Sequence, residues 1–242
     1  MEILFNILNV IKYLIYALLI IVFVIFIFLN VSPVFGASPD KNTKEIIANS
    51  ENFFEGKFRN IKTTYTNLRT LERKSTLKEW FFPPEDKNPL GPLPTIKFKG
   101  QDLTEGKFVW FGHSTLLMKT EGLVVMTDPV FNRASPLPSF SSKSKSSFFN
   151  GKPFVFENPI LIEDLPKVDV VIISHDHYDH LDSKAIKDLS NLVDHFIVPL
   201  GVGAHLERWG VDKNKITELD WYESKNYKDV DFTFTPALHF SG

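Results

Sequence analysis

The sequence contains no cysteine among its 242 residues. Disulfide bonds and thiolate metal ligands are therefore excluded, and any metal site must use histidine and carboxylate side chains. The absence does not indicate a compartment, because a chain without cysteine is compatible with either side of a membrane.

The chain also lacks an excess of charge of either sign. Its formal net charge is −2, and lysine and arginine form no basic stripe. Nucleic acid is therefore not expected as a partner. A content of 43% hydrophobic and 23% charged residues is ordinary for a globular protein rather than a disordered one.

One long hydrophobic run departs from this average. Residues 13–29 are 17 consecutive apolar residues, and residues 1–35 together are long enough to cross a bilayer. We predict a single-pass N-terminal membrane anchor, with a cleaved signal peptide and a buried core helix as the alternatives. Lys12 precedes the run and Lys41 and Lys44 follow it, which leaves the membrane side of the remaining chain open.

Residues 36–102 are polar and rich in proline. A helix is expected near residues 44–54, whereas five prolines in residues 81–94 disfavour a helix or a central strand. We interpret the segment as an ordered extension that wraps the domain at residues 103–242, with a disordered linker as the alternative.

From residue 103 onward the pattern predicts a mixed α/β domain. Three short β-rich runs are followed by a serine-rich loop at 135–150, interpreted as a lid or a solvated surface. The β-branched run at 168–174 is typical of a strand covered on both faces. A helix capped at Asp182 or Ser183 follows. Further strands are expected at 196–198, 216–221 and 230–235, and a further helix at 201–209.

Three histidines and two aspartates lie within the six residues that follow the buried strand. In extended backbone, residues two apart point the same way, so His175 and His177 can hold one ion from one side. Asp179 and His180 follow the turn and can face a second ion. Imidazole and carboxylate ligands favour zinc, with manganese, iron or nickel as alternatives, against a surface loop with coincidental histidines.

The segment 175–180 matches the HxHxDH motif of the metallo-β-lactamase superfamily. With it, four further segments resemble the branch that contains N-acylphosphatidylethanolamine phospholipase D and its bacterial relatives. These segments are WFGHST at 110–115, TDPVF with RASP at 127–136, PLGV at 199–202 and PALHFS at 236–241. The resemblance covers residues 53–242, and it implies the first half of an αβ/βα sandwich.

The resemblance implies that His175, His177 and His239 hold one zinc ion. It assigns Asp179 and His180 to a second ion, and Asp179 is also the candidate catalytic residue. Asp128 is expected to support the metal loop through hydrogen bonds, with a turn-forming Asp-Pro as the alternative.

The other polar residues near the motif have weaker assignments. His113, in a Gly-His-Ser turn, either supports the metal ligands or is a buried structural histidine. Asp176 alternates away from the neighbouring histidines and is expected to support rather than ligate. His195 and His205 have no partner cluster and are expected to be structural.

The chain departs from the family pattern at its end. Members supply a bridging aspartate and a last histidine from a second half of the fold, but this chain ends three residues after His239. We therefore expect a truncated domain whose first sheet lacks part of its cover and which binds about one zinc ion, where a full-length protein would bind two.

These features predict a membrane-anchored, zinc-dependent hydrolase of the phospholipase D type that acts on N-acylphosphatidylethanolamine-like lipids. The alternatives are a metallohydrolase of a soluble ester, lactone or β-lactam, and an inactive metal-binding remnant. Membrane lipid and the substrate are the expected partners, and the oligomeric state is left open.

Overall fold

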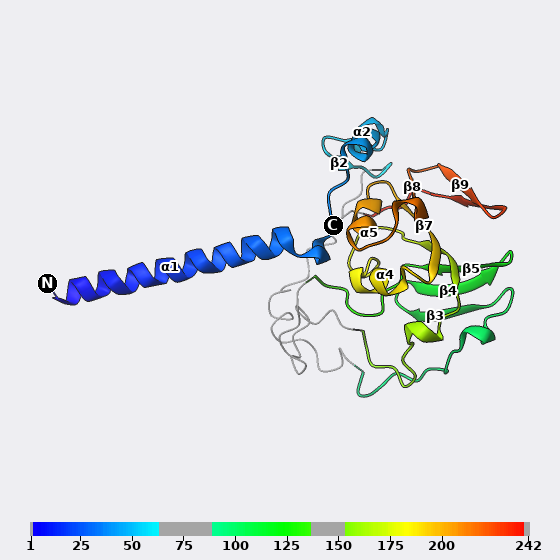
Figure 1. Ribbon diagram of the computed structural model, residues 1–242, viewed down its shortest axis with the longest axis horizontal. Coiled ribbons are helices and arrows are strands. Elements are labelled where there is room, and N and C mark those ends of the chain that lie inside the picture. The colour runs from blue at the N-terminus through cyan, green and yellow to red at the C-terminus, as the bar shows by residue number, and fades with distance from the viewer. Residues whose placement is uncertain (1, 63–88, 137–152, 240–242) are drawn as a thin grey trace.

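The protein is described here by a computed structural model covering residues 2–62, 89–136 and 153–239 (Figure 1). Part of the proline-rich stretch at 81–94, nearly all of the proposed lid at 135–150 and residues 240–242 lie outside the described residues.

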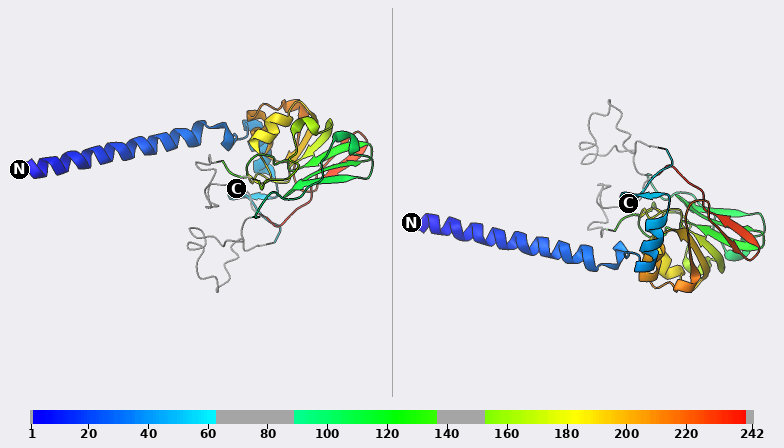
Figure 2. Two further views of the ribbon diagram at one scale, coloured as in Figure 1. Left: turned by 90° about the horizontal axis from the view of Figure 1, so that it is seen from below. Right: turned by 90° about the horizontal axis from the view of Figure 1, so that it is seen from above.

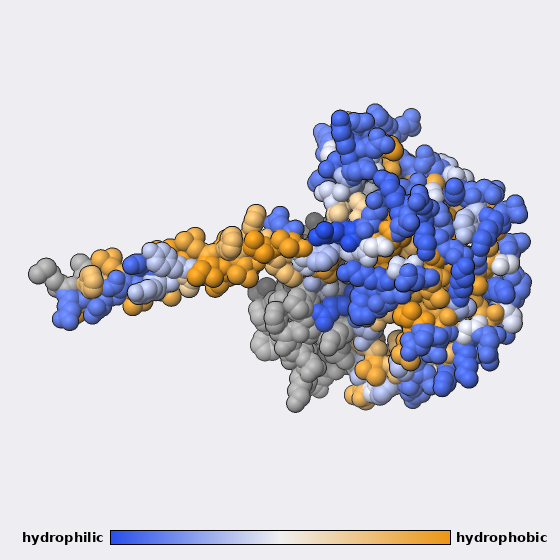
Figure 3. All heavy atoms as spheres, viewed as in Figure 1, coloured by the Kyte–Doolittle hydropathy of each residue, from blue (hydrophilic) through white to orange (hydrophobic). Residues whose placement is uncertain are grey.

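The hydrophobic run forms one helix, α1 (Glu2–Val31), which projects away from the domain (Figures 1 and 2). Thirty residues at 1.5 Å each give a helix of about 45 Å. Its part Phe5–Val31 is long and apolar enough to cross a membrane, and none of the most hydrophobic window is buried (Figure 3). The alternative of a buried core helix therefore does not apply, whereas an anchor and a signal sequence both remain compatible with this helix.

The domain is built on one six-stranded mixed sheet, which confirms the predicted α/β fold class. The strand order is β3-β4-β5-β6-β7-β8. The first three strands are antiparallel, and β5 to β8 are parallel. The bounds are β3 (Phe108–Gly112), β4 (Thr115–Thr120), β5 (Leu123–Thr127), β6 (Val168–Ile172), β7 (Val193–Pro199) and β8 (Ile216–Leu219).

Two short helices cover one face of this sheet. Asp182 caps α4 (Ser183–Leu189) by accepting hydrogen bonds from the amides of Lys184 and Ala185, as its sequence position predicts. The α4 side chains expected to face the core are all buried: Ala185, Ile186 and Leu189. The second helix is α5 (Gly203–Arg208), and both helices contribute to the larger hydrophobic core.

The other face carries a hairpin that the sequence analysis predicted only in part. β9 (Ser224–Tyr227) pairs with β10 (Val230–Thr233), and β9 was missed because SKNY lacks β-branched residues. Phe232 and its neighbours pack against Leu123 and Val125, which are only 4% exposed. The hairpin therefore covers this face at Leu123 and Val125.

The extension begins with α2 (Lys41–Asn49), three residues earlier than the predicted helix because Asp40 caps it. The hairpin β1 (Phe53–Phe54) with β2 (Lys57–Phe58) follows. Ser50 and Asn52 both donate to the Asp220 carboxylate of the domain. The domain boundaries themselves stay predictions. Four 3-10 helices complete the described elements: η1 (Pro33–Phe35), η3 (Gly100–Asp102), η5 (Ile162–Asp164) and η6 (Lys213–Lys215).

Candidate metal centre

The candidate residues meet at one edge of the central sheet. The 175–180 loop follows β6, and Asp128 directly follows β5, which runs parallel to β6. His113 follows β3, and two antiparallel pairings give β3 the same direction as β5. The carboxyl ends of all three strands therefore lie at the same edge.

The first group of possible ligands is the one implied by the family resemblance. Ligand atoms of His175, His177 and His239 lie within 4.8 Å of one another. His239 Nε2 is 3.2 Å from His177 Nδ1. His239 comes after β10, far along the chain, so only the folded structure brings it to this loop.

His175 shows in its hydrogen bonding how this group could serve a metal. Its Nδ1 lies 2.9 Å from the hydroxyl of Ser174. Its Nε2 is buried and has no hydrogen-bond partner within the described part of the chain. Burial, followed by the neighbouring imidazoles of His180 and His177, lowers the pKa of His175 to about 4. The ring is therefore neutral at pH 7. With its proton on Nδ1 toward the Ser174 oxygen, whose own hydrogen goes to Asp128, Nε2 is bare, as a metal ligand must be.

The second group contains a residue that the sequence analysis did not count as a ligand. His113 joins Asp179 and His180, again with ligand atoms within 4.8 Å of one another. His113 Nε2 lies 3.3 Å from His180 Nε2 and 3.1 Å from Asp179 Oδ2. The distance from His180 Nε2 to Asp179 Oδ2 is 3.9 Å. The structure therefore brings three possible ligands together here, where the sequence alone indicated two.

A sharp turn aims His113 at the loop. Gly112 and His113 both have positive φ angles, 107° and 46°, and the indole of Trp110 donates to the His113 carbonyl at 2.8 Å. A positive φ is uncommon outside glycine and often marks a functional position. The sequence signal was the Gly-His-Ser turn within a predicted strand meander, but only the fold shows that this turn lies at the sheet edge where β6 ends.

Asp128 is buried and holds the 175–180 loop, which we call the metal loop, in place. It accepts hydrogen bonds from the Ser174 amide and hydroxyl, both at 2.7 Å, and lies 2.8 Å from His180 Nδ1. With Nδ1 of His180 protonated toward this carboxylate, Nε2 is left bare and faces His113. Asp128 thus orients His180 rather than joining either group.

The contacts given for the two groups are compatible with a tetrahedral metal ion. A tetrahedral site with bonds of about 2.0–2.1 Å separates neighbouring ligand atoms by roughly 3.3 Å. The contacts of 3.2 Å in the first group and 3.1 to 3.9 Å in the second bracket this value. Imidazole and carboxylate donors fit zinc and its neighbours rather than magnesium or calcium.

The remaining histidines and Asp176 lie outside both groups. His195 Nε2 is 2.8 Å from the Thr217 hydroxyl, and its ring stacks on Tyr227. His205 accepts a hydrogen bond from the Ala37 amide at 3.1 Å. Burial, the larger effect, lowers the pKa of His205, and the carboxylate of Asp176 partly offsets this.

Comparison with known proteins agrees with the fold. Residues 124–242 match the β-lactamase superfamily domain. An uncharacterized protein of Mycobacterium tuberculosis is 37% identical over 201 residues, 80% of this chain and 50% of that protein. The N-acyl-phosphatidylethanolamine-hydrolyzing phospholipase D 1 of Caenorhabditis elegans is 35% identical over 187 residues, 72% of this chain and 49% of that protein.

The solved structure of CmlA, a diiron β-hydroxylase from Streptomyces venezuelae, covers 53% of this chain and 23% of its own, with 24% identity and a TM-score of 0.40. The chain spans about half the length of the curated relatives named above. On the matched domain, the shared sequence and the mixed sheet, the chain belongs to the metallo-β-lactamase superfamily and resembles the N-acyl-phosphatidylethanolamine-hydrolyzing phospholipases D within it.

Proposed function

We propose that the protein is a membrane-anchored, zinc-dependent hydrolase that cleaves a phosphodiester bond of N-acylphosphatidylethanolamine-like lipids. The observation that carries this proposal is the pair of adjacent three-residue ligand groups at one sheet edge. The activity of the C. elegans relative, an N-acyl-phosphatidylethanolamine-hydrolyzing phospholipase D, supports the lipid substrate. The helix α1 supports a position at a bilayer.

The reaction is a hydrolysis. Zinc held at these groups would lower the pKa of a water molecule and polarise the phosphorus–oxygen bond. The water oxygen forms a bond to phosphorus, and the bond from phosphorus to the N-acylethanolamine oxygen breaks. The leaving oxygen takes a proton, so the products are phosphatidic acid and an N-acylethanolamine.

The side chains of this protein have separate tasks in that scheme. The rings of His175, His177 and His239 would hold one ion, and His113, Asp179 and His180 would hold the other. Asp128 keeps His180 in the tautomer that leaves Nε2 bare. Three side chains in each group would leave at least one tetrahedral position of a bound ion for water or a phosphate oxygen.

Metal content tests the two groups directly. Because each group offers three side chains, the purified and dialysed chain should carry about two equivalents of zinc rather than one. His177→Ala and His113→Ala should each remove about one equivalent, from different groups. His195→Ala is the matched control, since His195 is a histidine outside both groups, and it should remove none. Two equivalents retained in His113→Ala would exclude His113 as a ligand.

The substrate class is tested with the full chain in liposomes. Release of N-acylethanolamine from liposomes that contain N-acylphosphatidylethanolamine should exceed hydrolysis of a soluble lactone or β-lactam. The reverse preference would favour a soluble-substrate metallohydrolase. Metal binding without turnover of any of these substrates would favour the inactive remnant.

A further inference from the structure

The segment that follows α1, residues 32–37, is fastened to the domain rather than hanging from it. We call this segment the neck. The Trp209 indole donates to the Pro33 carbonyl at 2.6 Å, and the Ala37 amide donates to His205 Nδ1 at 3.1 Å. Phe35 packs edge-on against Phe28 of α1, with ring centroids 5.4 Å apart. The neck is therefore in contact with both the helix and the domain.

The docking requires a glycine in the neck. A β-carbon at Gly36 would lie 1.8 Å from Nδ1 of His205, and Gly36 has a φ angle of 69°. The neck can approach His205 this closely only because Gly36 has no side chain. Gly122, in the β4–β5 turn, has a similar φ of 74°, but a β-carbon there would meet nothing within 4 Å.

The neck meets the sheet edge that carries both ligand groups, which we call the metal edge. It docks on α5 and Trp209, which follow β7, whereas the metal loop follows β6. Because β6 and β7 are parallel, both connections leave the sheet at the same edge. Figures 1 and 2 show α1 leaving the domain beside α5, on the side opposite the β9–β10 hairpin.

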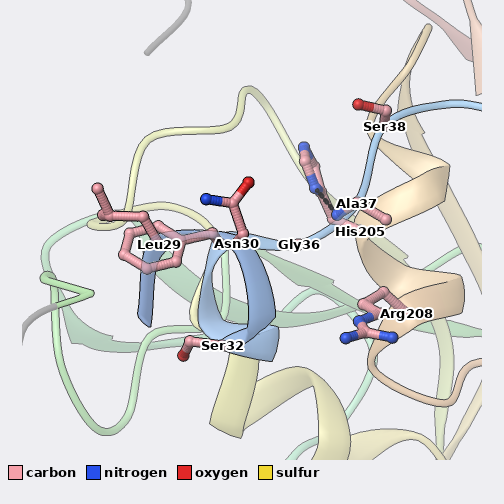
Figure 4. A pocket seen from close by; sticks show the side chains of 9 residues that line it. Leu29, Asn30, Ser32, Gly36, Ala37, Ser38, His205 and Arg208 are labelled. Atoms are coloured by element: carbon pink, nitrogen blue, oxygen red, sulfur yellow. Dashed lines mark hydrogen bonds between the residues drawn. The ribbon is translucent and has the colours of Figure 1, made fainter. Parts of the chain in front are cut away.

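A pocket that contains the guanidinium of Arg208 lies at the junction of α1 and α5 (Figure 4). It has a volume of about 470 Å³ and is lined by Leu29, Asn30, Ser32, Phe35, His205 and Arg208, among others. Arg208 donates to the Val31 carbonyl at 3.5 Å, and no carboxylate within the described ranges forms an ion pair with it. A guanidinium beside the end of a membrane helix lies at the level of lipid phosphates and has the geometry to bind them.

We propose that the docked neck presents the metal edge to the leaflet surface beside α1, with Arg208 contacting a phospholipid phosphate. The proposal rests on the membrane anchoring in the proposed function. It adds a fixed orientation, in which a lipid headgroup reaches the metal groups without leaving its bilayer. The partner surface is therefore the bilayer itself.

Single-cysteine labelling can measure this orientation, because the natural chain has no cysteine. Lys184→Cys places a fluorophore on the first turn of α4, at the metal edge, and Glu121→Cys places one on the β4–β5 turn at the opposite edge. In phosphatidylcholine vesicles that contain phosphatidylglycerol and a lipid-borne quencher, the label at position 184 should be quenched more strongly. Equal quenching at both positions would overturn the proposal.

Neck variants then test the cause. Gly36→Ala should abolish most of the quenching difference, whereas Gly122→Ala, which carries the same backbone strain, should preserve it. Should Gly36→Ala fail to fold, Trp209→Phe removes only the indole donor and should reduce the difference. Arg208→Gln should weaken quenching at position 184 while metal content stays unchanged. An unchanged difference in Gly36→Ala and Trp209→Phe would exclude the neck as its cause.

These readouts separate the orientation from the chemistry. Quenching requires no turnover, so an oriented chain that hydrolyses no lipid would contradict the proposed function and leave the orientation standing. A chain that hydrolyses lipid but shows equal quenching at both edges would support the proposed function and contradict the orientation. A chain that does not bind vesicles at all would overturn both.

Discussion

Asp128 combines a strained backbone with a buried charge. Its φ angle is 38°, in a region that residues other than glycine rarely adopt, and it is only 5% exposed. Three donors from Ser174 and His180 surround its carboxylate. Such a strained conformation persists only where the surrounding structure holds it, and here the hydrogen bonds with Ser174 and His180 do so.

We expect Asp128→Asn to weaken zinc binding by the second group. An amide carries no charge to hold His180 in the required tautomer, and loss of comparable supporting bonds lowers metal affinity about 10–100-fold. Competition with a chromogenic chelator measures the zinc affinity of the variant and of the parent chain. Asp229→Asn is the control, an exposed turn aspartate with a positive φ of 67°. Equal affinities in Asp128→Asn and the parent chain would contradict the role given to Asp128.

At the scale of elements, Asp182 connects the metal loop with the segment after β5. Besides capping α4, its carboxylate accepts hydrogen bonds from the amides of Phe131 and Asn132 and from the Asn132 side chain. The residue is only 4% exposed. One carboxylate therefore holds two of the connections that shape the metal edge.

Asp182→Ala should lower the free energy of unfolding by about 2 kcal/mol or more, because a lost cap costs about 0.5–2 kcal/mol and buried amides are left unsatisfied as well. Asp182→Asn keeps an oxygen acceptor and should lose less. Urea unfolding followed by circular dichroism measures both. A smaller loss in the alanine variant than in the asparagine variant would contradict this account.

Glu218 fixes the turn between β7 and α5. The amides of Gly201 and Gly203 both donate to its Oε1, at 2.9 and 2.7 Å. Burial is the largest effect on this carboxyl and raises its pKa above 4.5, although the two amides act in the opposite direction. The folded state therefore holds the proton more tightly than the unfolded state.

This shift gives a pH-dependent contribution to stability. The contribution is fully present below pH 4.5 and is lost as pH rises through the higher pKa of the folded state. Glu218→Gln retains the acceptor oxygen and does not titrate, so it should remove this part of the pH dependence. The melting temperatures of the parent chain and the variant, measured between pH 4 and 7, test this. Parallel pH profiles would contradict the raised pKa.

At the scale of the whole molecule, α1 accounts for the membrane association that we propose. Deleting residues 1–31 removes the apolar helix and leaves the neck in place. The shortened chain should therefore stay at the bottom of a density gradient in which liposomes float upward. Its zinc content should equal that of the full chain, because all six candidate ligands lie in the domain. Full retention on liposomes would show that another surface binds the membrane.

Local pattern determined much of this protein. The apolar run of α1, the β-branched strand β6 and the cap at Asp182 were readable because each depends on residues within a few positions. The cluster at 175–180 was readable for the same reason. β9 was missed because its residues become a strand only through pairing with β10.

Tertiary structure decided what distant segments do together. It placed His113 beside Asp179 and His180, because the β3–β4–β5 meander returns the chain to the edge where β6 ends. It also seated the neck on α5, a contact between residues more than 160 positions apart. Side-chain chemistry is set by the residue itself, but which side chains meet depends on strand direction and order, which no local stretch of sequence contains.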